Sequence, residues 1–132
     1  MSNVRNRRWW AICIALMLLV VLLSAALLMA FWRSRWQTVV LDEVSQPADF
    51  EFHARPGDLW PSKFVNRLDV IVTGEIDGAA EMLIDGEDPV KLSGNVQYER
   101  GGDWYDSDCR IRYEPTKVKS GHLKIRCRFR GL

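Results

Sequence analysis

Charged residues are missing from one long stretch of this sequence, and residue types that carry chemistry are scarce throughout. No charged side chain occurs from position 9 to 32. The only histidines, His53 and His122, match no zinc-binding spacing such as HExxH and have no cysteine beside them. No serine lies in a GxSxG pattern, and no glycine-rich segment ends in the Lys-Ser/Thr pair of a phosphate loop. The sequence therefore predicts no catalytic residue, no cofactor and no metal site, and favours a protein that is not an enzyme.

Acidic residues are absent from the first 35 positions, which carry five arginines: Arg5, Arg7, Arg8, Arg33 and Arg35. Residues 36–108 hold 5 basic and 16 acidic side chains, whereas residues 109–132 hold 8 basic side chains and one acidic. The net charge of +1 thus hides three segments of different sign. Because the chain after position 35 is net acidic and its basic residues are not interleaved with exposed aromatic rings, nucleic acid is not an expected partner.

The uncharged stretch at 9–32 predicts a transmembrane helix in contact with the lipid bilayer. Its 24 residues span roughly 36 Å as a helix, more than a hydrocarbon core of about 30 Å. Aromatic rings prefer the headgroup regions, and the predicted membrane-interface anchors are Trp9, Trp10, Phe31, Trp32 and Trp36. The alternative is a cleaved signal peptide, since Ser24-Ala25-Ala26 offers small residues. The apolar run nevertheless exceeds the roughly 7–15 residues of a signal peptide, which favours a retained, single-pass signal-anchor.

The predicted organisation has four parts, which are a basic N-terminal tail at 1–8, the transmembrane helix at 9–32, a short juxtamembrane linker at 33–36, and a β domain at 37–132. Three arginines precede the helix and two follow it. This positive-inside bias is small, and it favours a cytoplasmic N-terminus. The β domain is then expected on the extracytoplasmic side of the cell membrane, in the periplasm or outside the cell.

The remainder of the chain alternates strand-like segments with turn signals about every 10 to 15 residues. This spacing, with no helical period between the turns, predicts an antiparallel β-sandwich or small barrel of about six or seven strands. Asp77-Gly78 is typical of a two-residue hairpin turn between strands at 68–73 and 79–84. Further chain reversals are expected at 85–89 and at Gly101-Gly102. Residues 90–99 alternate between apolar and polar side chains, as in a strand with one buried face.

Two of the three cysteines, Cys109 and Cys127, fall in the last two predicted strands. Suppose that these strands form a hairpin in which Cys109 faces Cys127. Then Ile111 faces Ile125 and Tyr113 faces Leu123, so this register buries one apolar face. A disulfide between the two cysteines would close a loop of about 19 residues and contribute around 3 kcal/mol. The alternative is a pair of buried free thiols. A disulfide favours an extracytoplasmic domain, because such bonds persist in oxidising compartments.

The opposite face of the same predicted hairpin is strongly basic. Its cations are Arg110, Arg112, Lys124, Arg126, Arg128 and Arg130. One hypothesis is a surface for an anion or an acidic partner. The favoured alternative is neutralisation within the domain by acids on neighbouring strands, such as Glu75, Asp77, Glu81 and Asp85.

Two acidic turns and one aromatic pair complete the candidate features. Asp103, Asp106 and Asp108 form the tightest acidic group, and with Asp85, Glu87 and Asp88 they offer oxygen ligands to a calcium ion. The spacing matches no EF-hand loop, so solvated turns are the better interpretation. Trp104 and Tyr105 occupy successive positions, so one ring is expected in the core and the other outside, where it suits a protein or carbohydrate contact.

These features favour a membrane-anchored, non-enzymatic accessory or interaction protein that presents a β domain to a protein partner, within a larger membrane assembly. The second hypothesis is a binding module for anionic lipid or envelope polymer, acting through the basic hairpin. The third is an enzyme, which requires His53 or His122 beside a carboxylate in a cleft. No small-molecule ligand follows from the sequence.

Overall fold

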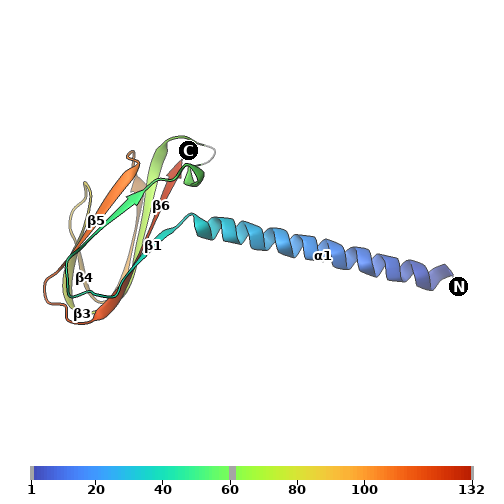
Figure 1. Ribbon diagram of the computed structural model, residues 1–132, viewed down its shortest axis with the longest axis horizontal. Helices are drawn as coiled ribbons and strands as arrows, with labels where there is room; N and C mark the ends of the chain where they lie inside the picture. The colour runs from blue at the N-terminus through green and yellow to red at the C-terminus, as the bar shows by residue number, and fades with distance from the viewer. Residues whose placement is uncertain (1, 60–61, 132) are drawn as a thin grey trace. The chain divides into compact units, whose positions relative to one another are not determined.

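The computed structural model describes the backbone of residues 2–59 and 62–131, and the side chains of 9–31, 35–59 and 62–131. The chain divides after Ser34 into two compact units, a helix and a β domain, and each is described by itself. Figure 1 shows the order of the elements along the chain.

The first unit is a single helix, α1, from Ser2 to Ser34. Within it, Trp9–Phe31 is long and apolar enough to cross a membrane. Leucine, alanine and methionine dominate this stretch, and all three are strong helix formers. The helix has apolar side chains on every side, and those from Trp9 to Phe31 are all exposed. Water does not stabilise such a surface, whereas a lipid bilayer does.

The second unit is a mostly antiparallel β domain that forms a nearly closed barrel. Its elements are β1 (Gln37–Leu41), β2 (Ala48–His53), a short 3-10 turn η1 (Pro56–Asp58), β3 (Val65–Ile84), β4 (Val90–Asp103), β5 (Asp108–Pro115) and β6 (Gly121–Gly131). The strand order is β1-β6-β3-β5-β2, and β4 pairs with β3. The two ends of this order approach each other where the Gln37 side chain donates a hydrogen bond to the His53 carbonyl, at 2.6 Å. Of the two expected architectures, the barrel is the nearer.

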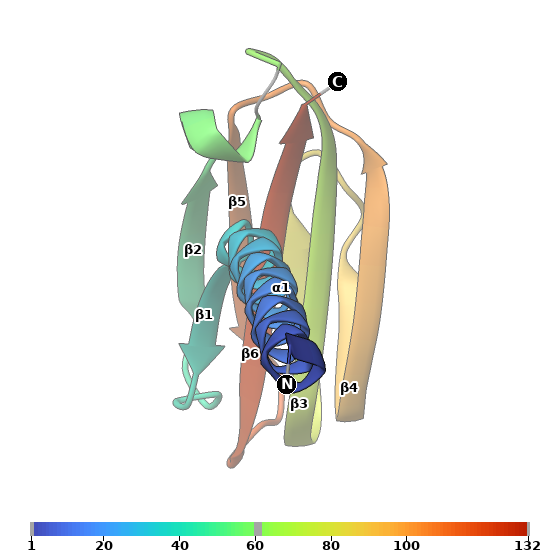
Figure 2. The ribbon, with the colours of Figure 1, turned by 90° about the vertical axis from the view of Figure 1, so that its right-hand side faces the viewer.

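The 20-residue strand β3 organises the barrel, because three other strands pair with it (Figure 2). Its first part, to Ile76, lies between β4 and β6, and its last part, from Ala80, lies between β4 and β5. The predicted hairpin turn at Asp77-Gly78 is wrong, since β3 runs straight through it with only a shift of register. The Asp77 carboxylate instead accepts hydrogen bonds from the backbone of Lys119 and Ser120, at 2.8 and 3.0 Å.

The other predicted reversals have mixed outcomes. The turn at 85–89 is confirmed, since β3 ends at Ile84 and β4 begins at Val90. Gly101-Gly102 is not a reversal, because both residues lie inside β4, and the chain turns after Asp103 instead. Gly101 faces Asp69 on β3, and a side chain at position 101 would collide with the Asp69 carboxylate. The glycine is therefore needed for close packing inside the strand rather than for a turn.

The core fills the barrel with alternate side chains from the strands. The apolar faces predicted for the last two strands are confirmed as buried. They comprise Cys109, Ile111, Tyr113, Leu123, Ile125, Cys127 and Phe129. The Tyr113 hydroxyl, fully buried, donates a hydrogen bond to the Val44 carbonyl at 2.8 Å, which satisfies its one polar group inside the core.

The predicted hairpin pairing of the last two strands is wrong. Strands β5 and β6 both pair with β3 and do not pair with each other. Cys109 lies opposite Phe52 on β2, while Cys127 lies opposite Gln37 on β1 and Val70 on β3. The reason is that the first part of the long β3 pairs with β6 and its last part pairs with β5. The alternation of apolar and polar residues within a strand does not show which strand it pairs with.

Cys109 and Cys127 nevertheless meet inside the barrel as free thiols. Both are fully buried, and a hydrogen bond joins them. This hydrogen bond and burial raise the pKa of Cys127 far above its ordinary value. The predicted disulfide is therefore not formed in this structure, which has the alternative of two buried free thiols, and the two cysteines meet across the core rather than between neighbouring strands.

Candidate interaction surfaces

The first candidate surface is an open groove at one end of the barrel, flanked by two exposed aromatic rings. Phe64 and Tyr105 are each 80% exposed, which is unusual for rings of their size. The groove has a volume of about 550 Å³. It is lined by Ala54, Pro56, Leu59, Ser62, Lys63, Phe64, Val65, Tyr105, Asp106 and Ser107. Its apolar lining with a few polar groups is typical of a binding site.

A second, acidic hollow of about 390 Å³ adjoins this groove. Its lining consists of Asp85, Gly86, Glu87, Asp103, Trp104, Tyr105, Asp106 and Asp108. Tyr105 and Asp106 line both depressions, so the two form one continuous surface. The sequence placed two acidic turns in one candidate site, and the fold brings five of those six acids to this hollow, with Asp88 outside its lining.

Most of these carboxylates already have partners in the fold. Asp85 accepts a hydrogen bond from the Arg110 backbone at 3.1 Å, and Asp106 accepts one from the Asp108 backbone at 3.2 Å. Glu87 forms an ion pair with Arg100. No group of three or more histidine, cysteine or acidic side chains suited to a metal ion occurs among the described residues.

One ring of the aromatic pair packs against the core and the other is exposed, as predicted, but Trp104 and Tyr105 lie in the turn between β4 and β5 rather than at successive positions of a strand. The Trp104 ring packs partly against the core, and its indole N–H donates a hydrogen bond to the Asp108 carbonyl at 3.2 Å. Tyr105 points outward. The Trp104 contact positions the chain just before β5, where Asp108 begins the strand.

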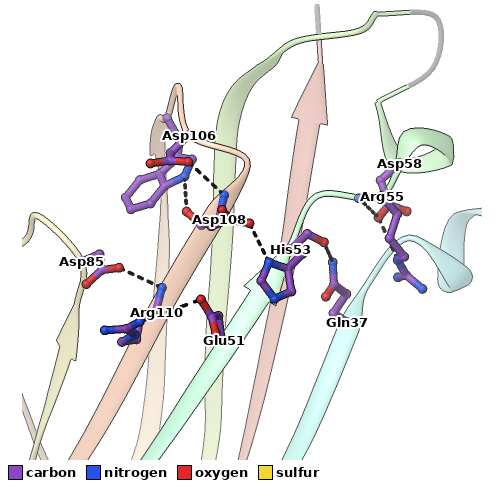
Figure 3. A network of polar contacts seen from close by, with 10 residues as sticks. Gln37, Glu51, His53, Arg55, Asp58, Asp85, Asp106, Asp108 and Arg110 are labelled. Atoms are coloured by element: carbon purple, nitrogen blue, oxygen red, sulfur yellow. Dashed lines mark hydrogen bonds and ion pairs between the residues drawn. The ribbon is translucent and has the colours of Figure 1, made fainter.

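His53 lies at the end of β2, directly opposite Asp108 at the start of β5. The His53 Nδ1 is 2.6 Å from the Asp108 carboxylate (Figure 3). The backbone carbonyl of His53 accepts the hydrogen bond from the Gln37 side chain. The hydrogen bond that the His53 ring donates to the Asp108 carboxylate, with the nearby charges of Asp108 and Glu51, raises the pKa of His53 above 6.5, although desolvation acts in the opposite direction. His53 lines neither the groove nor the acidic hollow.

His122 lies on another part of the barrel. With Glu75, its register partner on β3, it lines a wide hollow of about 330 Å³ together with Thr73, Gly74, Asn95, Val96 and Gln97. The enzyme hypothesis required a histidine and a carboxylate in one cleft. His53 bonds to Asp108, which lines the acidic hollow, although the His53 ring itself is not part of that lining. His122 shares a hollow with Glu75, and no hydrogen bond joins their side chains in the part of the chain described.

The six predicted surface cations do not form one basic face. Since β5 and β6 are not neighbours, Arg110 and Arg112 are separated from the four cations of β6. Arg112 Nε is 2.9 Å from the Asp49 carboxylate and its Nη1 is 4.0 Å from that of Glu114. Arg110 lies 3.9 Å from Glu51. Neutralisation within the domain, the favoured alternative, thus occurs on β5, mostly with acids that the sequence had not suggested.

Asp69 on β3 binds two of the remaining predicted cations, Arg128 and Arg130, together with Arg67 of its own strand. Its carboxylate accepts hydrogen bonds from Arg67 at 3.0 Å, Arg128 at 2.9 Å and Arg130 at 2.6 Å. Burial of Asp69 by itself would raise its pKa, but the hydrogen bonds from Arg128, Arg67 and Arg130 outweigh burial and lower it. Sequence reasoning missed Asp69, although an acid within the apolar run Leu68-Asp69-Val70-Ile71-Val72 was a signal of a buried, paired charge.

Arg126 and Lys124 make no ion pair in the described part of the domain. The Arg126 guanidinium lies 4.7 Å from the centre of the Trp36 ring, and that of Arg128 lies 4.3 Å from it. These are cation–π distances. Trp36 is half-buried and belongs to the β domain, whereas Trp9, Trp10 and Phe31 are exposed on α1. The side chain of Trp32, the remaining predicted membrane anchor, lies outside the described residues.

No protein-family model and no curated protein matches the chain. Among solved structures, a de novo designed double-stranded β-helix is 18% identical, over 72% of this chain and 97% of its own, with a TM-score of 0.37. The coat protein of Tobacco streak virus is 9% identical, over 70% and 85%, with a TM-score of 0.38. The NLP core of Drosophila is 9% identical, over 74% and 97%, with a TM-score of 0.36. At these scores the likenesses support no argument about function.

Proposed function

We propose that this protein is a single-pass membrane protein that works without catalysis, as an interaction subunit of a larger membrane assembly. In this proposal α1 is the anchor, and the β domain lies on the extracytoplasmic side and binds a protein partner. The observation that carries the proposal is the continuous surface formed by the groove and the acidic hollow, with the exposed Tyr105 ring at their junction.

The chemistry of this surface defines the kind of partner that fits it. The groove offers apolar side chains such as Leu59 and Phe64, which suit an apolar anchor residue. The hollow offers five carboxylates, three of which, Asp85, Asp103 and Asp106, take part in no ion pair in the described part of the domain. A partner segment with an apolar side chain next to a lysine or arginine complements both depressions.

Two observations support an extracytoplasmic domain. The arginine bias across the hydrophobic stretch favours a cytoplasmic N-terminus. Cys109 and Cys127 are close enough to hydrogen-bond, so small shifts of the chain would allow a disulfide to form in an oxidising compartment.

Site-specific photo-crosslinking in intact membranes tests the partner surface. A photoreactive residue replaces Phe64 or Tyr105, and the matched control replaces Val40, which is 56% exposed on β1. We expect Phe64 and Tyr105 to crosslink to a membrane-associated protein through a segment that contains both apolar and basic residues. Asp103→Lys and Asp106→Lys should each reduce that crosslinking several-fold. Equal crosslinking from Val40, or no effect of the charge reversals, would contradict the proposal.

A second candidate function, anion binding, is supported by the cations of β6, of which Arg126 lies over the Trp36 ring. Arg126 and Lys124 lie on β6 without a carboxylate partner among the described residues, and β6 pairs with β1, which follows the predicted anchor within a few residues of sequence. Such a group suits the phosphate of a lipid headgroup or an anionic polymer of the cell envelope. Reversal at Arg128 would damage its buried contact with Asp69, so the sharper test uses Arg126→Glu and Lys124→Glu.

Binding of the full chain to vesicles with and without anionic lipid, and to anionic polymer, measures this function. The two reversals should weaken binding, and the weakening should shrink at high salt because charge interactions are screened. Arg112→Glu on β5 is the matched control, since it removes an equal charge elsewhere. If Arg126→Glu and Lys124→Glu bind as the unmodified chain does, this second function is refuted.

A further inference from the structure

Strand β4 has one edge without a partner in the described part of the domain. It pairs with β3 along its whole length, and Figure 2 shows it at the margin of the sheet. In an antiparallel strand paired on one side, alternate residues direct their N–H and C=O groups outward. β4 contains 14 residues, whereas strands of 5–6 are usual, so its open edge is long. Such an edge is a template for pairing with another chain.

The side chains of β4 alternate between the core and the outer face. Leu92 and Val96 are buried, and Tyr98 is half-buried. The residues between them are exposed and form one outward row, Lys91, Ser93, Asn95, Gln97 and Glu99. This row has a cation near one end and an anion near the other. If a second copy of this row runs antiparallel to the first, Lys91 of one copy can therefore face Glu99 of the other.

We propose that β4 pairs antiparallel with β4 of a second copy of this chain, about a two-fold axis at Asn95. In this register Lys91 of each copy faces Glu99 of the other, and Ser93 faces Gln97. On the inner side Leu92 lies opposite Tyr98. Opposite charges and apolar side chains that face each other across strands stabilise antiparallel pairs. The contact is isologous, so it closes as a dimer, and it covers the β4 edge from 90 to 100, leaving only 101–103 unpaired.

The bend in β4 agrees with this register. Gly94 has a φ of +59°, in the left-handed region that favours glycine, and it divides the strand into the arms 90–93 and 95–103. With the axis at Asn95, the shorter arm of each copy meets the longer arm of the other. A two-fold axis at Ser93 places Asn95 opposite Lys91, so it forms no charge pair there. An axis at Gln97 places Asp103 opposite Lys91 but Gly102 opposite Leu92, so it loses the apolar pair that the axis at Asn95 provides.

Zero-length crosslinking of the unmodified full chain in mild detergent tests the pairing directly. A carbodiimide joins a lysine to a carboxylate in contact with it. Lys91 and Glu99 are eight residues apart in one strand, roughly 26 Å at the usual rise, so an amide between them has to connect two copies. Lys91 also lies opposite Glu81 within one copy, which supplies an internal positive control.

We expect Lys91–Glu99 crosslinked peptides in the dimer band, identified by mass spectrometry. Formation of Lys91–Glu81 crosslinks without Lys91–Glu99 crosslinks would overturn the proposal. Charge reversal gives a second measurement. Lys91→Glu and Glu99→Lys should each reduce the dimer about fivefold, since two symmetric charge pairs are lost, and the double exchange should restore it. Lys117→Glu, in the exposed loop between β5 and β6, is the matched control and should leave the dimer unchanged.

Cysteine substitution locates the two-fold axis. In a Cys13→Ser background, a cysteine at the axis faces its own copy and forms an intermolecular disulfide on mild oxidation. Asn95→Cys should give at least about three times more disulfide-linked dimer than Ser93→Cys or Gln97→Cys, because neighbouring facing pairs on the strand are displaced by several ångströms. A maximum at Ser93 or Gln97, or equal yields at all three positions, would overturn the register and with it the proposal.

Discussion

Asp69 is the residue on which the charge balance of the barrel depends most directly. Its side chain is 9% exposed, and it binds Arg67, Arg128 and Arg130. Removing one partner of a buried ion pair leaves uncompensated charge, which commonly costs about 3–5 kcal/mol. Three cations share this one carboxylate, and two of them are about half exposed. The loss is therefore expected near the lower limit.

We expect Asp69→Asn to reduce the free energy of unfolding by about 3 kcal/mol. Asp49→Asn removes the partner of Arg112 from an exposed pair and is the matched control, with an expected loss below about 1 kcal/mol. Chemical denaturation of both variants measures the difference. Because the pKa of Asp69 is lowered in the fold, its contribution is present above the unfolded pKa and is lost as pH falls through the folded pKa. Equal losses of unfolding free energy for the two variants would show that the Asp69 cluster stabilises the domain no more than an exposed ion pair does.

The His53–Asp108 pair makes stability depend on pH near neutrality. Its raised pKa means that the folded state favours protonated His53. The stabilisation is fully present below the unfolded pKa of about 6.5 and is lost as pH rises through the folded pKa. The thermal unfolding temperature of His53→Gln should therefore fall below that of the unmodified chain more at pH 5.5 than at pH 8.5.

Titration of the histidines by NMR provides the direct measurement for this pair. The pKa of His53 should lie above 6.5, and Asp108→Asn should lower it. His122→Gln controls for general effects of removing a histidine. A His53 pKa at or below 6.5 in the unmodified chain would contradict the interaction.

At the scale of the elements, the continuity of β3 depends on Gly78. A Cβ at this position would lie 1.7 Å from the Lys117 carbonyl oxygen, so the backbone at 116–118 would have to move. That loop is held against the β3 bulge by the hydrogen bonds to Asp77. Gly78→Ala should therefore reduce the free energy of unfolding by about 2 kcal/mol or more. Gly57→Ala, where a Cβ meets nothing within 4 Å, should have little effect, and a similar loss in both would refute the close contact.

The helix α1 makes a separate prediction, that the anchor is retained. If the hydrophobic stretch is an anchor rather than a cleaved signal peptide, the mature chain keeps the full 15.2 kDa and stays in the membrane fraction at alkaline pH. Intact mass spectrometry of the membrane fraction measures this. A mass corresponding to cleavage after Ser24-Ala25-Ala26 would show that the stretch is a signal peptide.

At the scale of the whole molecule, the state of the two buried cysteines reports the side of the membrane. Because both thiols are fully buried in the folded chain, labelling has to be done after denaturation. Without reductant, the denatured chain should take up one maleimide, at Cys13, and after reduction it should take up three. Uptake of three labels without reductant would contradict a disulfide between Cys109 and Cys127. The extracytoplasmic position would then rest on the arginine bias alone.

Local patterns in the sequence predicted much of the architecture. The uncharged run predicted α1, and alternation predicted the buried faces of β5 and β6, including Tyr113 and Phe129. These predictions succeed because helical and strand periods are properties of neighbouring residues. The prediction of a turn at Asp77-Gly78 is wrong because the same two residues also suit a β-bulge. Only the packing of the loop at 116–120 determines whether a turn or a bulge forms.

The candidate surfaces depended on the sheet topology far more than on local sequence. The acids of two distant turns meet in one hollow because the ends of β3 and β4 lie beside the start of β5. No feature of the sequence predicted a role for Phe64, since one aromatic residue in a loop has no periodic pattern. In the structure it flanks the groove. The six cations looked like one surface only under the assumption that β5 and β6 pair.

The sequence by itself determined that an apolar helix precedes a β-rich domain, because charge and periodicity are local properties that need no partner strand. Only the tertiary structure decided that β3 separates β5 from β6, that Cys109 meets Cys127 across the core, and that Asp69 collects three arginines. The physical reason is that strand pairing joins residues far apart in the chain. The free energy of those contacts depends on the whole barrel rather than on any one segment.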